Sequence, residues 1–140
     1  MNTTKILSLL GTFVLFSCQN ADNQEQHDLS PQVIEVHDEI MPMIPGFDKA
    51  ALKVDSILTN LDSIYAENQS LDTAEITKEL TQLKSDLEEA NDRMMVWMRE
   101  YAPDSLDNDY QESEMKKISE LREFFHKVSE QKDKNLHTFQ

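Results

Sequence analysis

The chain has 140 residues and a formal net charge of -14, from 13 Lys and Arg against 27 Asp and Glu. This length fits one small domain, and two glycines, four prolines and many Leu, Glu, Lys, Met and Ala favour an all-α fold. The acidity argues against a nucleic-acid partner, because binding to phosphates requires a basic face.

Residues 1–17 have the pattern of a lipoprotein signal peptide. Lys5 is the only positive residue, and the apolar stretch 6–16 is interrupted only by Ser8, Gly11 and Thr12. A membrane span needs about 20 apolar residues, so this stretch is too short to be one and has the length of a signal-peptide core. Cleavage after residue 17 removes one Lys and no acid, which leaves 12 basic and 27 acidic residues and a net charge of -15.

The only cysteine, Cys18, follows this apolar stretch directly. The segment Leu15-Phe16-Ser17-Cys18 resembles the bacterial lipobox, although Phe16 is bulkier than the residue usual at its position. The resemblance implies a diacyl or triacyl group on Cys18, and more than one lipid chain is what stable anchoring requires. We therefore expect a cell-envelope protein, anchored on the periplasmic side of a membrane or on the cell surface. The alternatives are an ordinary secretory peptide with an incidental cysteine and a buried N-terminal helix.

A polar segment separates the cysteine from the helical domain expected over residues 31–140. Residues 19–30 read QNADNQEQHDLS, without apolar periodicity, and predict a flexible tether over residues 18–30. Apolar or semi-apolar residues then recur at alternating steps of four and three, as in a bundle helix. They are Val33, His37, Ile40, Ile44, Phe47, Ala51, Val54, Leu58, Leu61 and Tyr65. Pro42 and Pro45-Gly46 interrupt this stretch without shifting its period, which predicts a kink rather than a long loop.

Two further helices follow the first. The second is expected to start at a Thr73 cap and to stop at Pro103, and the third to cover about 109–132. Their expected buried residues are Ile76, Leu80, Leu83, Leu87, Ala90, Met94, Trp97 and Tyr101 in the second, and Met115, Ile118, Leu121, Phe124 or Phe125, and Val128 in the third. Short connections make such helices antiparallel, so the sequence predicts a three-helix up-down bundle with a proline kink in the first helix. A helical hairpin that dimerises into four helices is the alternative.

Six methionines lie beyond the signal peptide, and the predicted topology gathers them at one end. A hairpin with its turn near Gln69 pairs residues whose numbers sum to about 138. This places Met41 and Met43 opposite Trp97 and Met95, His37 opposite Tyr101, and Met115, after a second turn near Leu106, toward Met98. Thioether sulfur and imidazole suit copper(I), so we hypothesise that His37 with two or more of Met41, Met94, Met98 and Met115 binds it.

The competing interpretation, which we favour, is that the methionines fill a kinked core next to the indole and that His37 is a core histidine. No cofactor is then expected. A haem held by the same His and Met residues ranks below copper, because no small residues open a slot for it. Glu123 and His126 have di-iron spacing, but a di-iron bundle requires two such motifs. Since phosphate loops and nucleophile elbows are also missing from the sequence, we expect no enzymatic activity.

Two blocks of sequence, HDEIMPM at residues 37–43 and MMVWMR at residues 94–99, are similar to an uncharacterised family of small helical lipoproteins from Bacteroidetes. Some members carry the label viral A-type inclusion protein. The resemblance implies a lipid anchor and a helical fold, and it transfers no catalytic residue. Pro45-Gly46 departs from the simpler kink expected of the family.

The sequence therefore predicts a membrane-anchored, non-enzymatic helical module that acts through contacts with a protein partner or through self-association. The alternative is copper(I) or other soft-metal binding at the His and Met end. The two functions differ in their tolerance of Leu for Met, because this exchange nearly conserves volume but removes the sulfur ligand.

Overall fold

The computed structural model describes residues 28–67, 69 and 72–139. The predicted signal peptide, Cys18 and most of the predicted tether lie outside these residues. Within the described ranges the chain is all-α, as predicted. The elements are α1 (Ser30–Ile40), the 3-10 helix η1 (Met41–Met43), α2 (Ile44–Thr59), α3 (Leu61–Glu67), α4 (Thr73–Glu100), α5 (Asn108–Leu136) and the 3-10 helix η2 (His137–Phe139).

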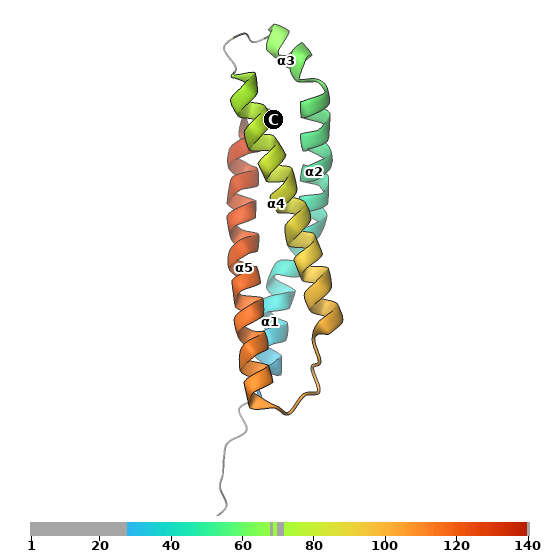
Figure 1. The fold of residues 1–140 in the computed structure, drawn as a ribbon, viewed down its shortest axis with the longest axis vertical. Coiled ribbons are helices and arrows are strands. Elements are labelled where there is room, and N and C mark those ends of the chain that lie inside the picture. Colours follow the sequence, from blue (N-terminus) through green and yellow to red (C-terminus); the bar gives the residue numbers. More distant parts are fainter. Residues whose placement is uncertain (1–27, 68, 70–71, 140) are drawn as a thin grey trace, which may run out of the picture.

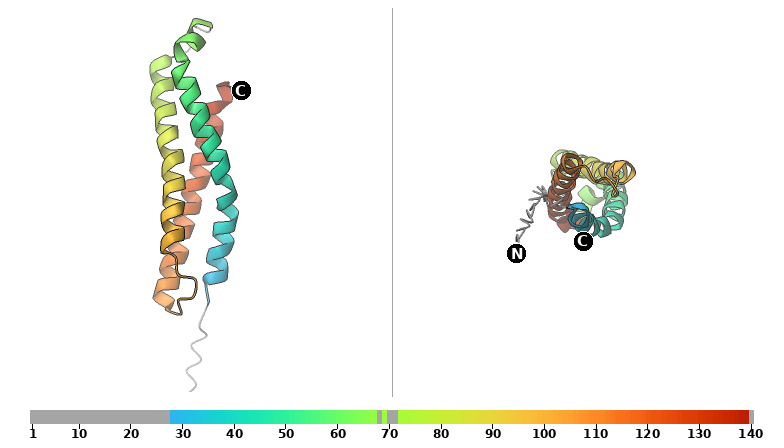
Figure 2. Two further views of the ribbon diagram at one scale, coloured as in Figure 1. Left: turned by 90° about the vertical axis from the view of Figure 1, so that its right-hand side faces the viewer. Right: turned by 90° about the horizontal axis from the view of Figure 1, so that it is seen from below.

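The helices form an elongated bundle in which successive long elements run up and down (Figures 1 and 2). The prediction of three helices is wrong in number, because α1, η1, α2 and α3 follow one another along a divided first rod. This rod changes neighbour along its length. Its first part, α1, packs chiefly against α5, whereas α2 packs chiefly against α4.

The first rod is divided at its prolines. Proline has no N–H to donate and its ring clashes with the preceding turn, so Pro42 and Pro45 cannot lie inside one regular helix. Instead each proline lies at the start of the next element, η1 or α2. The backbone stays right-handed through the break, and the Met41 N–H donates to the His37 carbonyl. The interruption is therefore a three-residue 3-10 turn. It is shorter than a long loop, but it divides the helix in two where the sequence predicted only a kink.

The long helices are capped by aspartates. Asp72 Oδ1 accepts hydrogen bonds from the amides of Ala74 and Glu75, each at 3.0 Å, so the cap of α4 is Asp72 and not the predicted Thr73. Asp107 caps α5 in the same way. The third helix extends four residues beyond its predicted end, to Leu136, because Leu136 is itself buried in the core.

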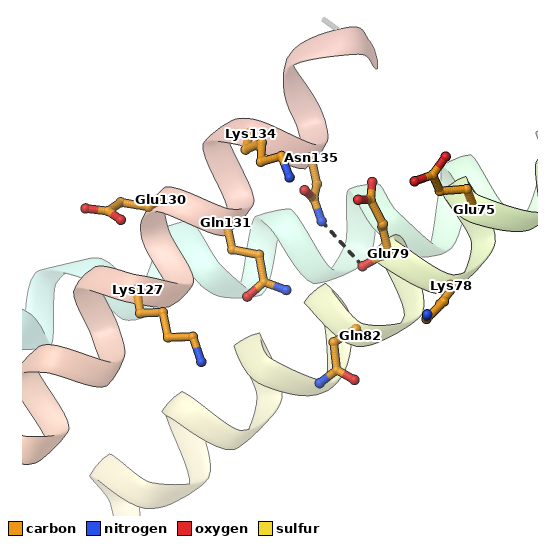
Figure 3. A pocket seen from close by; sticks show the side chains of 9 residues that line it. All are labelled: Glu75, Lys78, Glu79, Gln82, Lys127, Glu130, Gln131, Lys134 and Asn135. Carbon is orange, nitrogen blue, oxygen red and sulfur yellow. Dashed lines mark hydrogen bonds between the residues drawn. The ribbon is translucent and has the colours of Figure 1, made fainter. Parts of the chain in front are cut away.

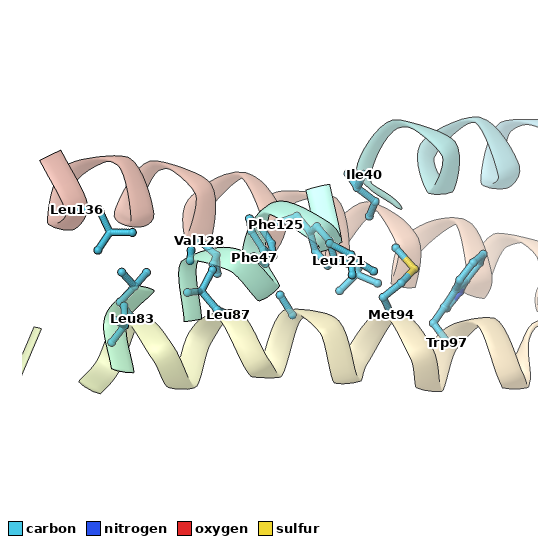
Figure 4. Packing of buried hydrophobic residues seen from close by; sticks show 14 of the residues in the cluster. Ile40, Phe47, Leu83, Leu87, Met94, Trp97, Leu121, Phe125, Val128 and Leu136 are labelled. Carbon is cyan, nitrogen blue, oxygen red and sulfur yellow. The ribbon is translucent and has the colours of Figure 1, made fainter. Parts of the chain in front are cut away.

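The core follows most of the predicted apolar positions (Figure 4). In α5, Phe125 is the buried member of the Phe124–Phe125 pair, and Met115 is only partly buried. Tyr65, expected at the end of the first apolar line, is 42% exposed because the rod is interrupted again at Asn60. No helix in the described ranges has both the length and the apolar character to cross a bilayer.

Candidate functional site at the chain-entry end

The chain enters the bundle beside the connection between α4 and α5, and we call this the entry end (Figure 1). Here three rings are stacked, from α1, from α4 and from the residue that directly follows α4. The His37 ring lies 5.7 Å from the Trp97 ring at an interplanar angle of 29°, and Trp97 lies 4.8 Å from Tyr101 at 18°. The predicted partner of His37 was Tyr101, four residues farther along the chain and just past the end of α4. The pairing is displaced because α1 has turned from α4 toward α5.

A buried polar network fixes the Trp97 ring. Its indole Nε1 donates to Glu114 Oε2 at 3.0 Å, and Lys117 Nζ donates to Glu114 Oε1 at 2.6 Å. Glu114 is only 4% exposed, and a buried carboxylate requires such partners. The hydrogen bond and the charge of Glu114 raise the pKa of Lys117 above its ordinary value. The indole plane is therefore held by a directional contact as well as by packing.

A second buried amide attaches the entering chain to the same end. The Leu29 N–H donates to Gln111 Oε1 at 2.7 Å, and Gln111 Nε2 donates to the Ser105 carbonyl at 2.8 Å. Ser30 Oγ donates to the Pro103 carbonyl at 3.1 Å. The last residues of the predicted tether are thus bound to the bundle.

Sequence reasoning missed Gln111 and Glu114, although a signal was present. Continuing the spacing of Ile118 and Leu121 toward the start of α5 leads to positions 114 and 111. Both residues are polar, so an apolar pattern passes over them, yet they are 4% and 5% exposed. Polar residues at positions that continue a buried apolar pattern are therefore candidates for a buried hydrogen-bond network.

The residues of the predicted copper site lie in different environments. Met94 is fully buried, Met98 is 42% exposed, and Met41 and Met115 are partly buried. His37 Nδ1 lies 2.9 Å from Asp38 Oδ1, and the His37 side chain is 18% exposed. The structure therefore brings His37 to the turn of α4 that carries Met94 and Met98, and copper binding itself stays a prediction.

Apolar side chains are exposed at this end of α4. Met95, Val96 and Met98 are 48%, 41% and 42% exposed. A groove of about 330 Å³ runs beside them between α4 and α5. Its lining combines the apolar Val96, Trp97 and Leu121 with the charged Asp92, Arg93, Glu100 and Lys117.

The opposite end of the bundle, which we call the far end, holds a larger and more polar groove of about 630 Å³ between α4 and α5 (Figure 3). Acidic and basic side chains alternate around it, and Asn135 Nδ2 donates to the Glu79 carbonyl at 3.4 Å. Phe139 partly covers a third hollow, of about 300 Å³, near Leu80. The larger groove balances its own charge, with three acidic and three basic residues in its lining.

The described residues hold no group of three or more His, Cys, Asp or Glu side chains that could bind a metal ion. In the single Glu-x-x-His of α5, His126 faces α1 instead, where its Nε2 lies 3.0 Å from Glu39 Oε1. Comparisons with family models, curated proteins and solved structures find no match. Function is therefore inferred from the residues of the chain itself.

Proposed function

We propose that the chain is a lipid-anchored, non-enzymatic helical protein of the cell envelope that acts through protein contacts at its entry end. The observation that carries this proposal is the exposure of Met95 and Met98 on one side of α4, while the exposed Val96 lines the adjacent groove between α4 and α5. Single exposed apolar residues are ordinary on protein surfaces. Several together, beside a groove with an apolar lining, are characteristic of an interaction surface.

The anchor would place this surface near a membrane. Nine residues separate Cys18 from Asp28, so the ten steps of chain between them span at most about 36 Å. The hydrogen bonds of Leu29 and Ser30 join the entering chain to the end that carries Met95 and Met98. The lipobox at residues 15–18 and the resemblance to small helical lipoproteins support the same location.

Photo-crosslinking in intact cells tests the protein contact. A photoreactive residue in place of Arg99, next to Met98, is expected to give a discrete crosslinked species. The double substitution Met95→Glu and Met98→Glu should abolish it, because carboxylates cannot be buried against an apolar partner. Leu52→Glu is the matched control, since Leu52 is 71% exposed on α2. An identical crosslink in all three proteins would refute the proposed surface.

The anchor is tested separately. Replacement of Cys18 by Ser is expected to move the protein from the membrane fraction to the soluble fraction of the envelope and to remove the mass of the acyl chains. A protein that still begins at residue 1 and carries no lipid would rule out the anchored location. It would leave the contact surface to be judged by the crosslinking.

A second candidate is copper(I) binding by His37 with two or more of Met41, Met94, Met98 and Met115. It is favoured by the stacking of His37 on Trp97, which brings the imidazole to the level of Met94 and Met98. The expected result is copper(I) uptake against a competing chelator, lost in the Met94→Leu and Met98→Leu double variant and kept in Met43→Leu. Equal uptake by both variants, or none by the unaltered protein, would exclude this site.

A further inference from the structure

One side of α4 loses its neighbour at the entry end. Asn91 Nδ2 donates to Asp48 Oδ1 at 2.6 Å, so this side of α4 faces the first rod. Met95 and Met98 follow Asn91 by four and seven positions and lie on the same side. On the N-terminal side of Asp48 the first rod turns away from α4, because α1 packs chiefly against α5. The consequence is that Asn91 is partly buried whereas Met95 and Met98 are exposed.

The first rod contributes a matching edge to this opening. Asp48 is preceded at helical spacing by Met41, which is partly buried, and by Ile34, which is 38% exposed. Between the two edges the stacked rings of His37 and Trp97 form the floor. We call Ile34, Met95 and Met98, with this floor, the Met surface. Methionine side chains adapt to the shape of a partner, and surfaces rich in them accept amphipathic helices.

The charge around the Met surface is predominantly acidic, although Arg99 adjoins Met98 on α4 and Arg93 and Lys117 line the neighbouring groove. Segments 28–48 and 101–114, which belong to the entry end together with the adjoining turns of α4 and α5, contain no Lys or Arg. They contain ten acidic residues, namely Asp28, Glu35, Asp38, Glu39, Asp48, Asp104, Asp107, Asp109, Glu112 and Glu114. Two of these carboxylates are balanced by α5, since Glu39 lies near Arg122 and His126 and Glu114 near Lys117. A partner that covers the Met surface is thus placed against an acidic rim.

From this combination we infer that the Met surface receives a basic amphipathic helix of a partner protein. Burial of the partner's apolar face supplies affinity, and its Lys or Arg residues complement the acidic rim. A second copy of this acidic chain is disfavoured, because its own entry end carries the same charge. The inference rests on the proposed function and names the chemical class of the partner.

The single tryptophan makes the contact measurable in the full-length protein. Trp97 is 8% exposed and belongs to the floor of the Met surface. The probe is a tryptophan-free peptide of Leu and Lys with helical spacing, about five turns long, added to the protein in phosphatidylcholine vesicles. We expect a saturable change in Trp97 emission whose affinity falls as salt is raised. The same peptide with Glu for Lys should produce no change.

Matched variants locate the binding. Met95→Glu with Met98→Glu should weaken binding by about tenfold or more, and Leu52→Glu should not. Circular dichroism checks that each variant keeps its helices, and Met95→Leu with Met98→Leu is expected to bind normally. For the rim, Glu35→Gln with Asp38→Asn should weaken binding several-fold, whereas the same changes at Glu130 and Asp133 of the far end should not. The inference is overturned if the Met95→Glu and Met98→Glu double variant binds the Lys peptide as tightly as Leu52→Glu does, or if the unaltered protein does not bind the Lys peptide.

The outcomes separate this inference from the function on which it rests. If the Lys peptide fails to bind but Met95→Glu and Met98→Glu still abolish the crosslink in cells, the surface stands and the basic-helix partner is wrong. A dimer of the full-length protein that these substitutions dissociate would show that the surface joins two copies instead, and it would overturn the inference. If the crosslink in cells persists in the Met95→Glu and Met98→Glu double variant, the proposed function is refuted as well.

Discussion

The two ends of the bundle differ in how their charges are balanced. At the far end, segments 73–87 and 122–139 carry six acidic and six basic residues. Lys84 there lies 2.7 and 2.8 Å from the two Asp55 oxygens. The entry-end segments 28–48 and 101–114 carry ten acidic residues and no Lys or Arg. Some of these carboxylates support the fold, as Asp107 does in capping α5 and Glu114 in holding Trp97, whereas exposed ones such as Glu35 are available for recognition.

The two ends also differ in what fills them. Aliphatic side chains such as Leu83, Val128 and Leu136 close the far end (Figure 4). At the entry end, where α1 leaves α4, the wider space is filled by the Trp97 ring and by the buried side chain of Glu114. Aliphatic packing tolerates small shifts, whereas a buried hydrogen bond fixes one geometry. The buried side chains of the entry end are accordingly held in a more fixed geometry than those of the far end.

The largest effect is expected from Trp97→Ala. Loss of this side chain removes the floor of the Met surface and leaves Glu114 without its indole donor. Large aromatic truncations in a core cost about 3–5 kcal/mol in the free energy of unfolding. Trp97→Phe keeps most of the volume and should cost about 1–3 kcal/mol, the range for a buried group that loses its partner. Urea unfolding followed by circular dichroism measures both, and a cost below about 1 kcal/mol for Trp97→Ala would mean that the network does not support the fold.

A smaller and local effect is expected from Gln111→Ala. The change leaves the Leu29 N–H and the Ser105 carbonyl without their side-chain partner, at a cost of about 1–2 kcal/mol. The Leu29 amide should exchange its hydrogen faster, while amides near Leu136 at the far end should change only as global stability does. Gln82→Ala is the control, since Gln82 donates to Asp86 on the exposed side of α4. Unchanged exchange at Leu29 would contradict the proposed attachment of the entering chain.

The aspartate caps allow a like-for-like comparison of the ends. Asp72 caps α4 at the far end and Asp107 caps α5 at the entry end, each through two backbone amides. Replacement of either by Ala is expected to lower the free energy of unfolding by about 1 kcal/mol, and replacement by Asn by less, because Asn is also a good cap. A much larger loss for Asp107→Ala in urea unfolding would show that the connection at the entry end depends on more than the cap.

The register of the helices was predictable where the chain stays regular. The hairpin arithmetic pairs residues whose numbers sum to about 138. Asp55 with Lys84 and Asp48 with Asn91 both sum to 139, in agreement with it. His37 with Trp97 sums to 134, because α1 has left α4 for α5. Apolar spacing records which face is buried but not which neighbour buries it, so the change of partner at η1 was not readable from the sequence.

The partners of the buried polar residues were the other part beyond reach of the sequence, since helical spacing leads to positions 111 and 114 but not to the groups that they bond. Ile118 and Leu121 were predicted from their apolar character, whereas the burial of Glu114 depends on a donor from another helix, the Trp97 indole. Such a pairing follows only from the three-dimensional register. The predicted copper ligands illustrate the same limit, since Met94 and Met98 share a helix but differ in exposure from 0% to 42%.

The smallest effect, and the one that compares the ends most directly, is the response to alkaline pH. The hydrogen bond that Lys84 donates to Asp55 raises the pKa of Lys84 at the far end, and the one that Lys117 donates to Glu114 raises the pKa of Lys117 at the entry end. A lysine pKa that is higher in the folded state stabilises the fold below lysine's ordinary value, about 10.4, and this contribution is lost as the pH rises through the folded value. Urea unfolding above pH 10 should therefore show a steeper loss of stability for the unaltered protein than for Lys84→Met or Lys117→Met. Subtracting the pH dependence of each variant from that of the unaltered protein cancels the titration of the tyrosines, which all three proteins share. Lys116→Met, with a side chain that is 78% exposed and 3.9 Å from Glu120, is the control for removal of a surface charge. Because Glu114 is buried and Asp55 is half exposed, salt should reduce the Lys84 effect more than the Lys117 effect, and equal screening at the two positions would mean that the entry-end network is open to solvent.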